Sequence, residues 1–252
     1  MYIPNNTKEF IEMVAKHAWP AKVQQQYHQW ILRANDGVTK RANSVYTIGN
    51  IPEDDNWLAE IELFYNEAHI SPCFYITELS PSNLDRILSD RNYEKVASLS
   101  ILSIESKQII DQVEMDTNLR VELTPEVTSS WLSSFIKLEG HKWQDADAFQ
   151  TIFQGIRLSK AFVSLHLADE VVAVATIATE RGWGYISNVV VNTQFRRRGI
   201  ATQLFLHLAK WALNNNAKTL FMQVLADNEP ALHLYYKLGF EQIAKSHYRM
   251  KM

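Results

Sequence analysis

Three consecutive arginines and two small residues stand together in the segment RRRGIA, residues 196–201. The arginines supply positive charge and forked N–H donors, which suit the oxygens of a phosphate group. Gly199 and Ala201 leave space for such an anion to approach the backbone. The segment predicts a loop that binds a diphosphate, although a solvated basic turn at the end of a strand would have the same composition.

The elements on either side of this loop present it to a ligand. A strand, Trp183–Val191, with the apolar run Ile186–Val191, precedes the loop, and a helical pattern from Gly199 to Leu213 follows it. The first turn of a helix has N–H groups without intrahelical partners and carries a partial positive charge. A strand, a glycine-containing loop and a helix in this order form an anion site from backbone groups.

A second informative segment, residues 228–240, follows the next predicted strand, Thr219–Leu225. The helix expected here has residues that are typical of helix ends: Asn228 as the N-cap, Pro230 in the first turn and Gly239 as the left-handed residue that ends it. On this structural interpretation Tyr235 is a packing residue. That interpretation explains the ends of the helix, but not why the helix comes one strand after a phosphate-type loop.

Together the two segments resemble the GNAT superfamily of acyl-CoA-dependent N-acyltransferases. The pattern Arg196-x-x-Gly199-x-Ala201 matches the pyrophosphate loop of that family, Q/R-x-x-G-x-G/A. Residues 228–240, with Tyr235 and Gly239-Phe240 in register, match its second coenzyme motif. The resemblance covers roughly residues 120–252. It implies an α/β fold with a mixed sheet, the GNAT acyl-CoA N-acyltransferase fold.

The resemblance also implies a role for each motif residue. Backbone N–H groups from Arg197 to Thr202 would hold the pyrophosphate of acetyl-CoA. The strand edge at Val189–Val191 would pair with the pantetheine arm, and Asn228 would contact the coenzyme near the phosphates or the pantetheine. The expected coenzyme-binding residues are Val189, Val190, Val191, Arg196, Arg197, Arg198, Gly199, Ile200, Ala201, Thr202 and Asn228.

Tyr235 occupies the family position whose phenol protonates the departing CoA thiolate, and the motif register favours it over Tyr236. Direct attack of a neutral amine on the thioester builds an oxyanion and expels a thiolate, so donors aimed at both lower the barrier. The base that takes the amine proton is not identified by the sequence. Candidates near predicted strand ends, each also explained as an ordinary polar residue, are Glu180, Asp227, His166 and His247.

The resemblance points to an N-acetyltransferase that uses acetyl-CoA as cosubstrate and a primary amine as acceptor, in a ternary complex. The acceptor could be a small molecule or a protein. Trp131, Trp143 and Trp183 could line its site, although large aromatic residues are more often core. An alternative is a non-catalytic module that keeps the GNAT fold and binds acyl-CoA or another protein.

Composition narrows the partners. With a net charge of -3 and a sequence pI near 6.2, the chain has no overall attraction for nucleic acid or anionic lipid, and we expect neither partner. Cys73 is the single cysteine, which fits a reducing compartment and leaves an acyl-cysteine route unsupported. No Cys/His set has zinc spacing, so we expect no metal. No secretory or membrane-spanning segment is evident, which favours a cytoplasmic protein.

The first half of the chain repeats the element order of the second: strand 44–48, helix 54–69, strand 73–79, helix 82–90 and a further strand. Leu88 then stands where Tyr235 stands, and Pro81 where Asn228 stands. The counterpart of the arginine loop is residues 49–55, whose carboxylates would repel a diphosphate. We therefore expect two GNAT-like lobes, a degenerate one at 1–115 and a catalytic one at 116–252, although helix and strand alternate in many α/β proteins.

Other elements are less clearly marked. Met1–Gln26 reads as one or two helices, and Asn35-Asp36-Gly37 as the turn of a hairpin between 30–34 and 41–48. Residues 106–118 could be a strand, a loop or a junction. A helix is expected from Thr124-Pro125-Glu126 to about Lys137, and two short strands are expected at 240–243 and 246–250.

Overall fold

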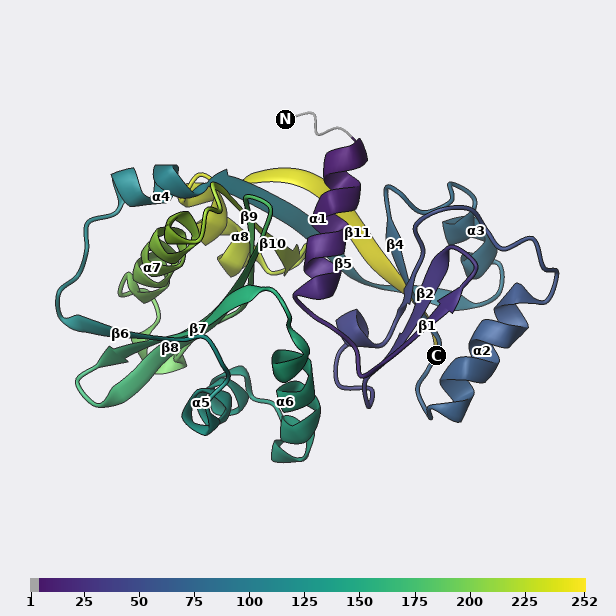
Figure 1. Cartoon of the computed structure of the whole chain (residues 1–252), viewed down its shortest axis with the longest axis horizontal. Helices are drawn as coiled ribbons and strands as arrows, with labels where there is room; N and C mark the ends of the chain where they lie inside the picture. Colours follow the sequence, from purple (N-terminus) through teal and green to yellow (C-terminus); the bar gives the residue numbers. More distant parts are fainter. Residues whose placement is uncertain (1–4) are drawn as a thin grey trace.

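A single mixed sheet of eleven strands runs through the computed structural model, which describes residues 5–252. The strand order is β1-β2-β3-β4-β11-β5-β10-β9-β8-β7-β6 (Figure 1). The strands are β1 (Val23–Tyr27), β2 (Trp30–Ala34), β3 (Val45–Tyr46), β4 (Cys73–Thr77), β5 (Tyr93–Glu105), β6 (Leu119–Thr124), β7 (Ser159–Leu167), β8 (Glu170–Glu180), β9 (Trp183–Val191), β10 (Thr219–Leu225) and β11 (Glu241–Lys251). The helices are α1 (Asn5–His17), α2 (Trp57–Glu67), α3 (Leu84–Ser89), α4 (Ser106–Gln112), α5 (Ser129–Glu139), α6 (Ala146–Gly155), α7 (Ile200–Asn214) and α8 (Glu229–Lys237).

The second half of the sheet begins as a meander and ends in a crossover. Strands β6 to β9 pair in sequence and antiparallel. The chain then passes through α7 and returns as β10, parallel to β9. The expectation of a mixed sheet with one parallel pair in this region is confirmed, and β9 and β10 have the expected bounds.

The two halves of the chain have the same order of elements and exchange their last strands. The series β3–α2–β4–α3–β5 matches β9–α7–β10–α8–β11, and β3 and β4 are parallel as β9 and β10 are. However, β5 pairs with β10, and β11 pairs with β4. The two exchanged strands also pair with each other, antiparallel, at the centre of the sheet. The halves therefore share one sheet, and the division into lobes 1–115 and 116–252 remains a prediction.

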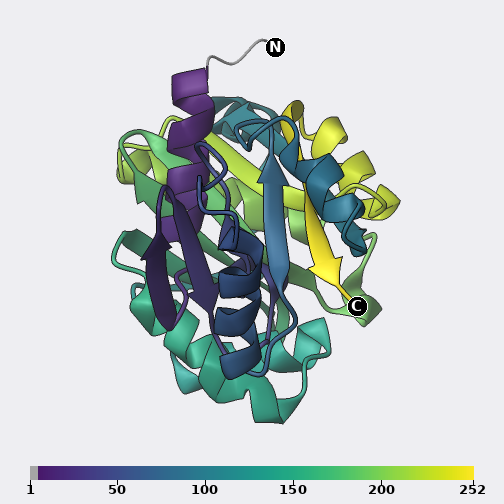
Figure 2. The ribbon, with the colours of Figure 1, turned by 90° about the vertical axis from the view of Figure 1, so that its right-hand side faces the viewer.

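Helices cover both faces of this sheet. One core cluster contains buried residues of α4, α7 and α8, and another joins α1 to α5 and α6 on the opposite face of the C-terminal half. Strands of the N-terminal half pack against α2 and α3, and α2 lies in front of them in Figure 2. Helix α1 crosses the middle of the molecule, between the two halves (Figure 1). No helix among residues 5–252 is long and apolar enough to cross a membrane.

Several expectations about local structure were wrong. Helix α1 ends at His17 and residues 23–27 form β1, since they pair with β2 along their whole length; Met1–Pro4 lie outside the described residues. Helix α5 begins at Ser129, because the Thr128 side chain accepts a hydrogen bond from the Trp131 amide and caps the helix there.

The remaining differences concern strand pairing. Strands β2 and β3 are antiparallel but meet only at Ile31 and Tyr46, so Asn35-Asp36-Gly37 begins a longer connection instead of a tight hairpin. Residues 106–112 form helix α4. The two short strands expected at the C-terminus are one strand, β11, with register shifts at 242–244 and 246–248.

Candidate functional site

Strands β9 and β10 separate part-way along their length, and this opens the candidate site. Their parallel pairing runs from Trp183 and Thr219 to Ile186 and Met222 and then ends. Strand β9 continues to Val191, paired with β8 on its other side. The edge of β9 that faces β10 is therefore without a strand partner from Ser187 to Val191, the segment that contains Val189, Val190 and Val191.

A bulge in β9 lies at the start of this free edge. The register between β8 and β9 shifts between Val174 and Thr176, and Asn188 has a left-handed φ of 56°. The Asn188 side chain donates a hydrogen bond to the Thr176 hydroxyl, 2.8 Å away, which holds the bulge in place. Bulges bend a strand and interrupt its pairing. This bulge thus helps β9 to diverge from β10.

The arginine loop follows β9 and leads into α7. Gly199 has a φ of +79° and is the N-cap of α7, a conformation that residues with a Cβ adopt at a cost. A Cβ added to Gly199 would meet no atom within 4 Å, so the surface beside it is open. Arg197 is also left-handed, with a φ of 64°. The loop therefore presents its backbone outward at the point where the helix begins.

The amide groups of this loop are free. The first amide of α7 that donates within the chain is that of Gln203, to the Gly199 carbonyl oxygen at 3.1 Å. None of the six N–H groups from Arg197 to Thr202 has an acceptor among residues 5–252, which includes those of Gly199, Ile200 and Ala201. Arg196, Arg197 and Arg198 are exposed beside them. This array of donors at a helix N-terminus is suited to an anion.

Tyr235 lies on α8, on the α7 side of the sheet. It is buried and its ring packs against Phe205 and Phe240. Burial, reinforced by the nearby Glu139 carboxyl group, raises the pKa of Tyr235 to about 12. Its hydroxyl group makes no hydrogen bond with residues 5–252, and the phenol keeps its proton at neutral pH. It is therefore chemically able to act as a proton donor.

Asn228 is the N-cap of α8, as the sequence indicated. Its side-chain oxygen accepts a hydrogen bond from the Ala231 amide at 3.3 Å, and Gly239 ends the helix with a φ of +94°. These contacts confirm the structural interpretation of both residues. A contact between Asn228 and a coenzyme remains a prediction.

Glu139, at the C-terminal end of α5, was missed by sequence reasoning. Its carboxyl group interacts electrostatically with both Arg196 and Tyr235, although α5 and α8 belong to opposite faces of the sheet. The surrounding protein atoms raise its pKa, and the Arg196 charge partly offsets this rise. No local motif marks this residue, because three distant segments bring these groups together.

The four candidate bases do not converge on the gap. Glu180 lies 3.0 Å from His17, at the closed end of the β9 pairing, and His166 lies 3.4 Å from Glu122 near the outer edge of the sheet. His247 is 2.6 Å from Asp85 on the N-terminal half, and Asp227 is exposed after β10.

The three tryptophans also have other surroundings. Trp131 is buried among phenylalanines and donates to the Val163 carbonyl oxygen, while Trp183 packs against Phe221. Trp143 is 62% exposed. Within residues 5–252 no group of three or more His, Cys, Asp or Glu side chains is placed to hold a metal ion.

Comparison with known proteins identifies the family. Residues 9–250 match the family described as "Probable histone acetyltransferase Rv0428c C-terminal". The chain is a GNAT acetyltransferase. It is 37% identical to the "Uncharacterized N-acetyltransferase YobR" of Bacillus subtilis strain 168, over 96% of this chain and 97% of that protein.

Solved structures of GNAT proteins share the fold. A GCN5-related N-acetyltransferase from Kribbella flavida superposes with a TM-score of 0.73 at 15% identity, covering 100% of this chain and 96% of that one. A tandem GNAT protein from the clavulanic acid biosynthesis pathway has a TM-score of 0.63 at 11% identity, covering 79% and 70% of the two chains. In the chain described here, the two motif segments, residues 196–201 and 228–240, follow β9 and β10, the strands that border the gap.

Proposed function

We propose that this GNAT protein transfers an acetyl group from acetyl-CoA to a primary amine by direct attack in a ternary complex. One observation supports this most strongly. The free edge of β9 leads directly into six amide groups, Arg197 to Thr202, that have no hydrogen-bond acceptor in the described part of the chain. An extended arm that ends in a diphosphate would complement both features. Acetyl-CoA has this form.

Each part of the donor has a counterpart in the protein. The pyrophosphate would accept hydrogen bonds from the amides of Arg197 to Thr202, with Arg196, Arg197 and Arg198 supplying charge. The pantetheine amides would pair with the backbone of Val189–Val191, as a strand would. The thioester would then lie where β9 and β10 separate, near Ile186 and Met222.

The chemistry requires one proton to leave the amine and one to reach the sulfur. The amine nitrogen forms a bond to the thioester carbonyl carbon, and the bond from that carbon to sulfur breaks. Tyr235 donates its phenolic proton to the departing thiolate, a task that suits an acid which remains protonated at neutral pH. The acetylated amine and free CoA are the products.

A thiol-release screen tests this proposal. The purified chain is incubated with acetyl-CoA and a panel of primary amines, and free CoA is measured against a reaction without amine. We expect release that depends on one class of amine, with mass spectrometry showing one acetyl group on the acceptor. Acetyl-CoA binding without amine-dependent release on any acceptor would contradict the proposal and favour a non-catalytic module.

A further inference from the structure

A polar cavity lies between the two halves of the chain, on the face of the sheet that carries α1. The space inside it amounts to about 10 Å³, room for about one water molecule, and it opens to solvent, so a larger ligand requires its side chains to move apart. Its walls come from α1, β2, β3, β4, β10, β11 and the loop before β3. The polar side chains that line it are Glu12, Lys16, Arg33, Arg41, Ser44, Tyr46, Tyr75, Gln223 and Tyr248.

Four of these side chains have a buried polar atom with no hydrogen-bond partner among residues 5–252. The atoms are Glu12 Oε2, Arg33 Nε, one terminal guanidinium nitrogen of Arg41, and the Tyr46 hydroxyl oxygen. Glu12 and Arg33 are only 4% and 3% exposed. Buried polar groups nearly always have partners, so this many unpaired groups around one cavity mark it as a site for water or for a polar ligand.

The charges of the cavity are unbalanced. Lys16, Arg33 and Arg41 are cationic, and Glu12 is the single acidic residue that lines it. No ion pair joins Glu12 to any of the three within residues 5–252. Partial burial and the Arg33 charge lower the pKa of Lys16, which shows that these cations disfavour one another. A ligand with a carboxylate would relieve this repulsion.

A chain of hydrogen bonds connects the cavity to the gap between β9 and β10. Gln223 is the first residue of β10 beyond its pairing with β9, and its side-chain nitrogen donates to the Tyr75 hydroxyl at 2.9 Å. The Tyr75 hydroxyl lies 3.2 Å from Glu12 Oε1, within hydrogen-bond distance. Tyr185, on β9, donates to Gln223 at 3.2 Å. Glu12 is thus two hydrogen bonds away from the strand that borders the proposed thioester position.

We propose that the acceptor is a small amine that carries a carboxylate, such as a free amino acid, and that this cavity binds it. This inference rests on the proposed function, since it assigns the second substrate of the same reaction. Arg41 and Arg33 bind the carboxylate, and Glu12 receives the amino group. A protein lysine has no carboxylate at the required distance from its amine and would leave the arginines unpaired.

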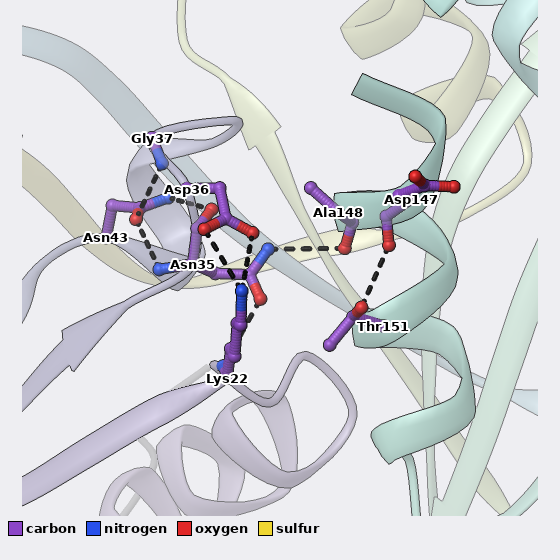
Figure 3. Close-up of polar contacts among 8 residues, drawn as sticks. All are labelled: Lys22, Asn35, Asp36, Gly37, Asn43, Asp147, Ala148 and Thr151. Atoms are coloured by element: carbon purple, nitrogen blue, oxygen red, sulfur yellow. Dashed lines mark hydrogen bonds and ion pairs between the residues drawn. The ribbon is translucent and has the colours of Figure 1, made fainter. Parts of the chain in front are cut away.

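Several hydrogen bonds fix the conformation of the loop that carries Arg41, as recognition of a small ligand requires. The Asn43 side-chain oxygen accepts from the amides of Asn35 and Gly37, at 2.6 and 3.1 Å. The Asn35 side chain accepts from the Lys22 amide and donates to the Ala148 carbonyl oxygen on α6 at 3.2 Å, so it links the loop to the C-terminal half (Figure 3). Arg41 itself lies over the ring of Trp19, with 4.6 Å between the guanidinium carbon and the ring centre.

Glu12 also has the properties needed to accept a proton. Burial raises the pKa of its carboxyl group to about 8, closer to that of an amine than an ordinary carboxyl group is. In the ionised form of Glu12, an ammonium group beside its carboxylate can transfer one proton to it, which leaves a neutral amine and a neutral acid in a poorly hydrated site. The amine then attacks the thioester, the departing thiolate takes the Tyr235 proton, and the second proton that the nitrogen loses passes through solvent to restore the Tyr235 phenol.

The test compares amino acids with their decarboxylated counterparts. Histidine and histamine, tyrosine and tyramine, and lysine and cadaverine are assayed with acetyl-CoA, together with a lysine-containing peptide whose two ends are blocked. We expect at least one amino acid to exceed its decarboxylated partner about 100-fold in kcat/KM. Comparable rates for the amines or the blocked peptide would overturn the inference, while leaving the proposed function intact.

Variants locate the effect in the cavity. Arg41→Gln should raise the KM for the preferred amino acid about 10- to 100-fold, the usual contribution of a charge-assisted hydrogen bond, and abolish the preference over the decarboxylated amine. Arg120→Gln, on the exposed strand β6, is the matched control and should change neither value. The acetyl-CoA affinity of each variant, measured by calorimetry, should match that of the wild type. Failure of the wild type to bind acetyl-CoA would refute the proposed function, whereas an unchanged KM in Arg41→Gln would refute the acceptor assignment.

Glu12→Gln tests the proton acceptor. It should lower kcat at neutral pH and shift the acidic limb of the pH profile toward the pKa of the free amine. An unchanged pH profile would exclude Glu12 from that role.

Discussion

The loop after β9 and the loop after β3 occupy the same position in two halves with the same order of elements, yet they differ in charge and in how many of their amide groups are hydrogen-bonded. After β9, six consecutive N–H groups lack acceptors among the described residues, and three arginines flank them. After β3, the Asp54 backbone and side chain accept from the amides of Trp57 and Asn56, and Gln29 accepts from that of Asn50. Among the described residues, the loop after β3 thus satisfies three of its amides, whereas the loop after β9 satisfies none of these six.

The strands beside these loops differ in the same way. Beyond the last pair of β3 and β4, the Thr47 hydroxyl donates to the Tyr75 carbonyl oxygen on β4 at 2.7 Å. Beyond the last pair of β9 and β10, at the equivalent place, the edge of β9 remains open. The second helix of each series, α3 in one half and α8 in the other, contributes Leu88 and Tyr235, respectively, to the core. A shared topology therefore does not determine a ligand site; the charge of the loop, its hydrogen bonding and the open strand edge distinguish the two halves.

The largest expected effect that separates the halves is that of Gly199→Glu. A carboxylate at this open position would lie among the amides that we assign to the pyrophosphate and would repel it. We expect acetyl-CoA affinity to fall by at least about 1000-fold, since both charge and backbone conformation are disturbed. Isothermal titration calorimetry measures it.

Gly199→Ala is the control for backbone strain alone. It keeps the surface uncharged and should weaken binding far less than the glutamate does, by about 10-fold, in line with the cost of a left-handed alanine. Affinity retained in Gly199→Glu would contradict the loop assignment.

Tyr235→Phe should have the next largest effect. Loss of a positioned acid lowers kcat by about 100-fold, while the aromatic packing and acetyl-CoA affinity are kept. Because burial holds the pKa of Tyr235 near 12, the wild type should show no loss of protonated phenol up to about pH 10.

Tyr236→Phe is the matched control, since Tyr236 is the neighbouring phenol and is 49% exposed. It should leave kcat unchanged. A full rate in Tyr235→Phe on a confirmed acceptor would remove Tyr235 from the mechanism, and a slow Tyr236→Phe would transfer the role to Tyr236.

A smaller effect on stability is expected at Glu12, between the two halves. Its pKa is near 8 in the folded state against 4.5 ordinarily, so between these values the folded protein binds more protons than the unfolded chain. The free energy of unfolding should therefore fall as pH rises from about 5 to about 8, by on the order of a few kcal/mol. Chemical denaturation of the wild type and of Glu12→Gln at several pH values measures this contribution.

The other titratable and charged groups around Glu12 are the same in both proteins. They are Lys16, Arg33, Arg41, Tyr46, Tyr75, Tyr248 and, at longer range, Glu78. The stability of Glu12→Gln relative to the wild type should therefore grow with pH. A constant difference across the range would show that Glu12 is ionised in the folded state.

The smallest effect is expected in the loop of the N-terminal half. Glu53 and Asp55 are exposed, so Glu53→Gln with Asp55→Asn should change stability by less than about 0.5 kcal/mol and acetyl-CoA affinity by less than twofold. Calorimetry should still find no site in this half. The appearance of a second site would mean that charge repulsion, and not satisfied amides, keeps the donor out.

Local signals predicted the region around the donor site well. The bounds of β9 and β10, the N-cap Asn228 and the left-handed Gly239 all follow from local chemistry, which the sequence displays directly. The start of α5 was wrong because two capping signals compete four residues apart, and Thr128 rather than Thr124 makes the side-chain hydrogen bond.

Features that depend on distant segments were not predictable. The exchange of β5 and β11 leaves each strand with ordinary local character, so the sequence gives no sign of its partner. The acceptor cavity gathers Glu12, Arg33, Arg41 and Gln223 from four separate segments, and none belongs to a motif. Even β1 was mistaken for a helix, because only its pairing with β2 defines it as a strand.

The central claim is that one half of this chain binds the acetyl donor and the other does not. Calorimetric titration of the wild type with acetyl-CoA, repeated with Gly199→Glu, tests it most directly. The account predicts one binding site per chain in the wild type and none in the variant. Two sites in the wild type, or one site that survives in Gly199→Glu, would contradict it.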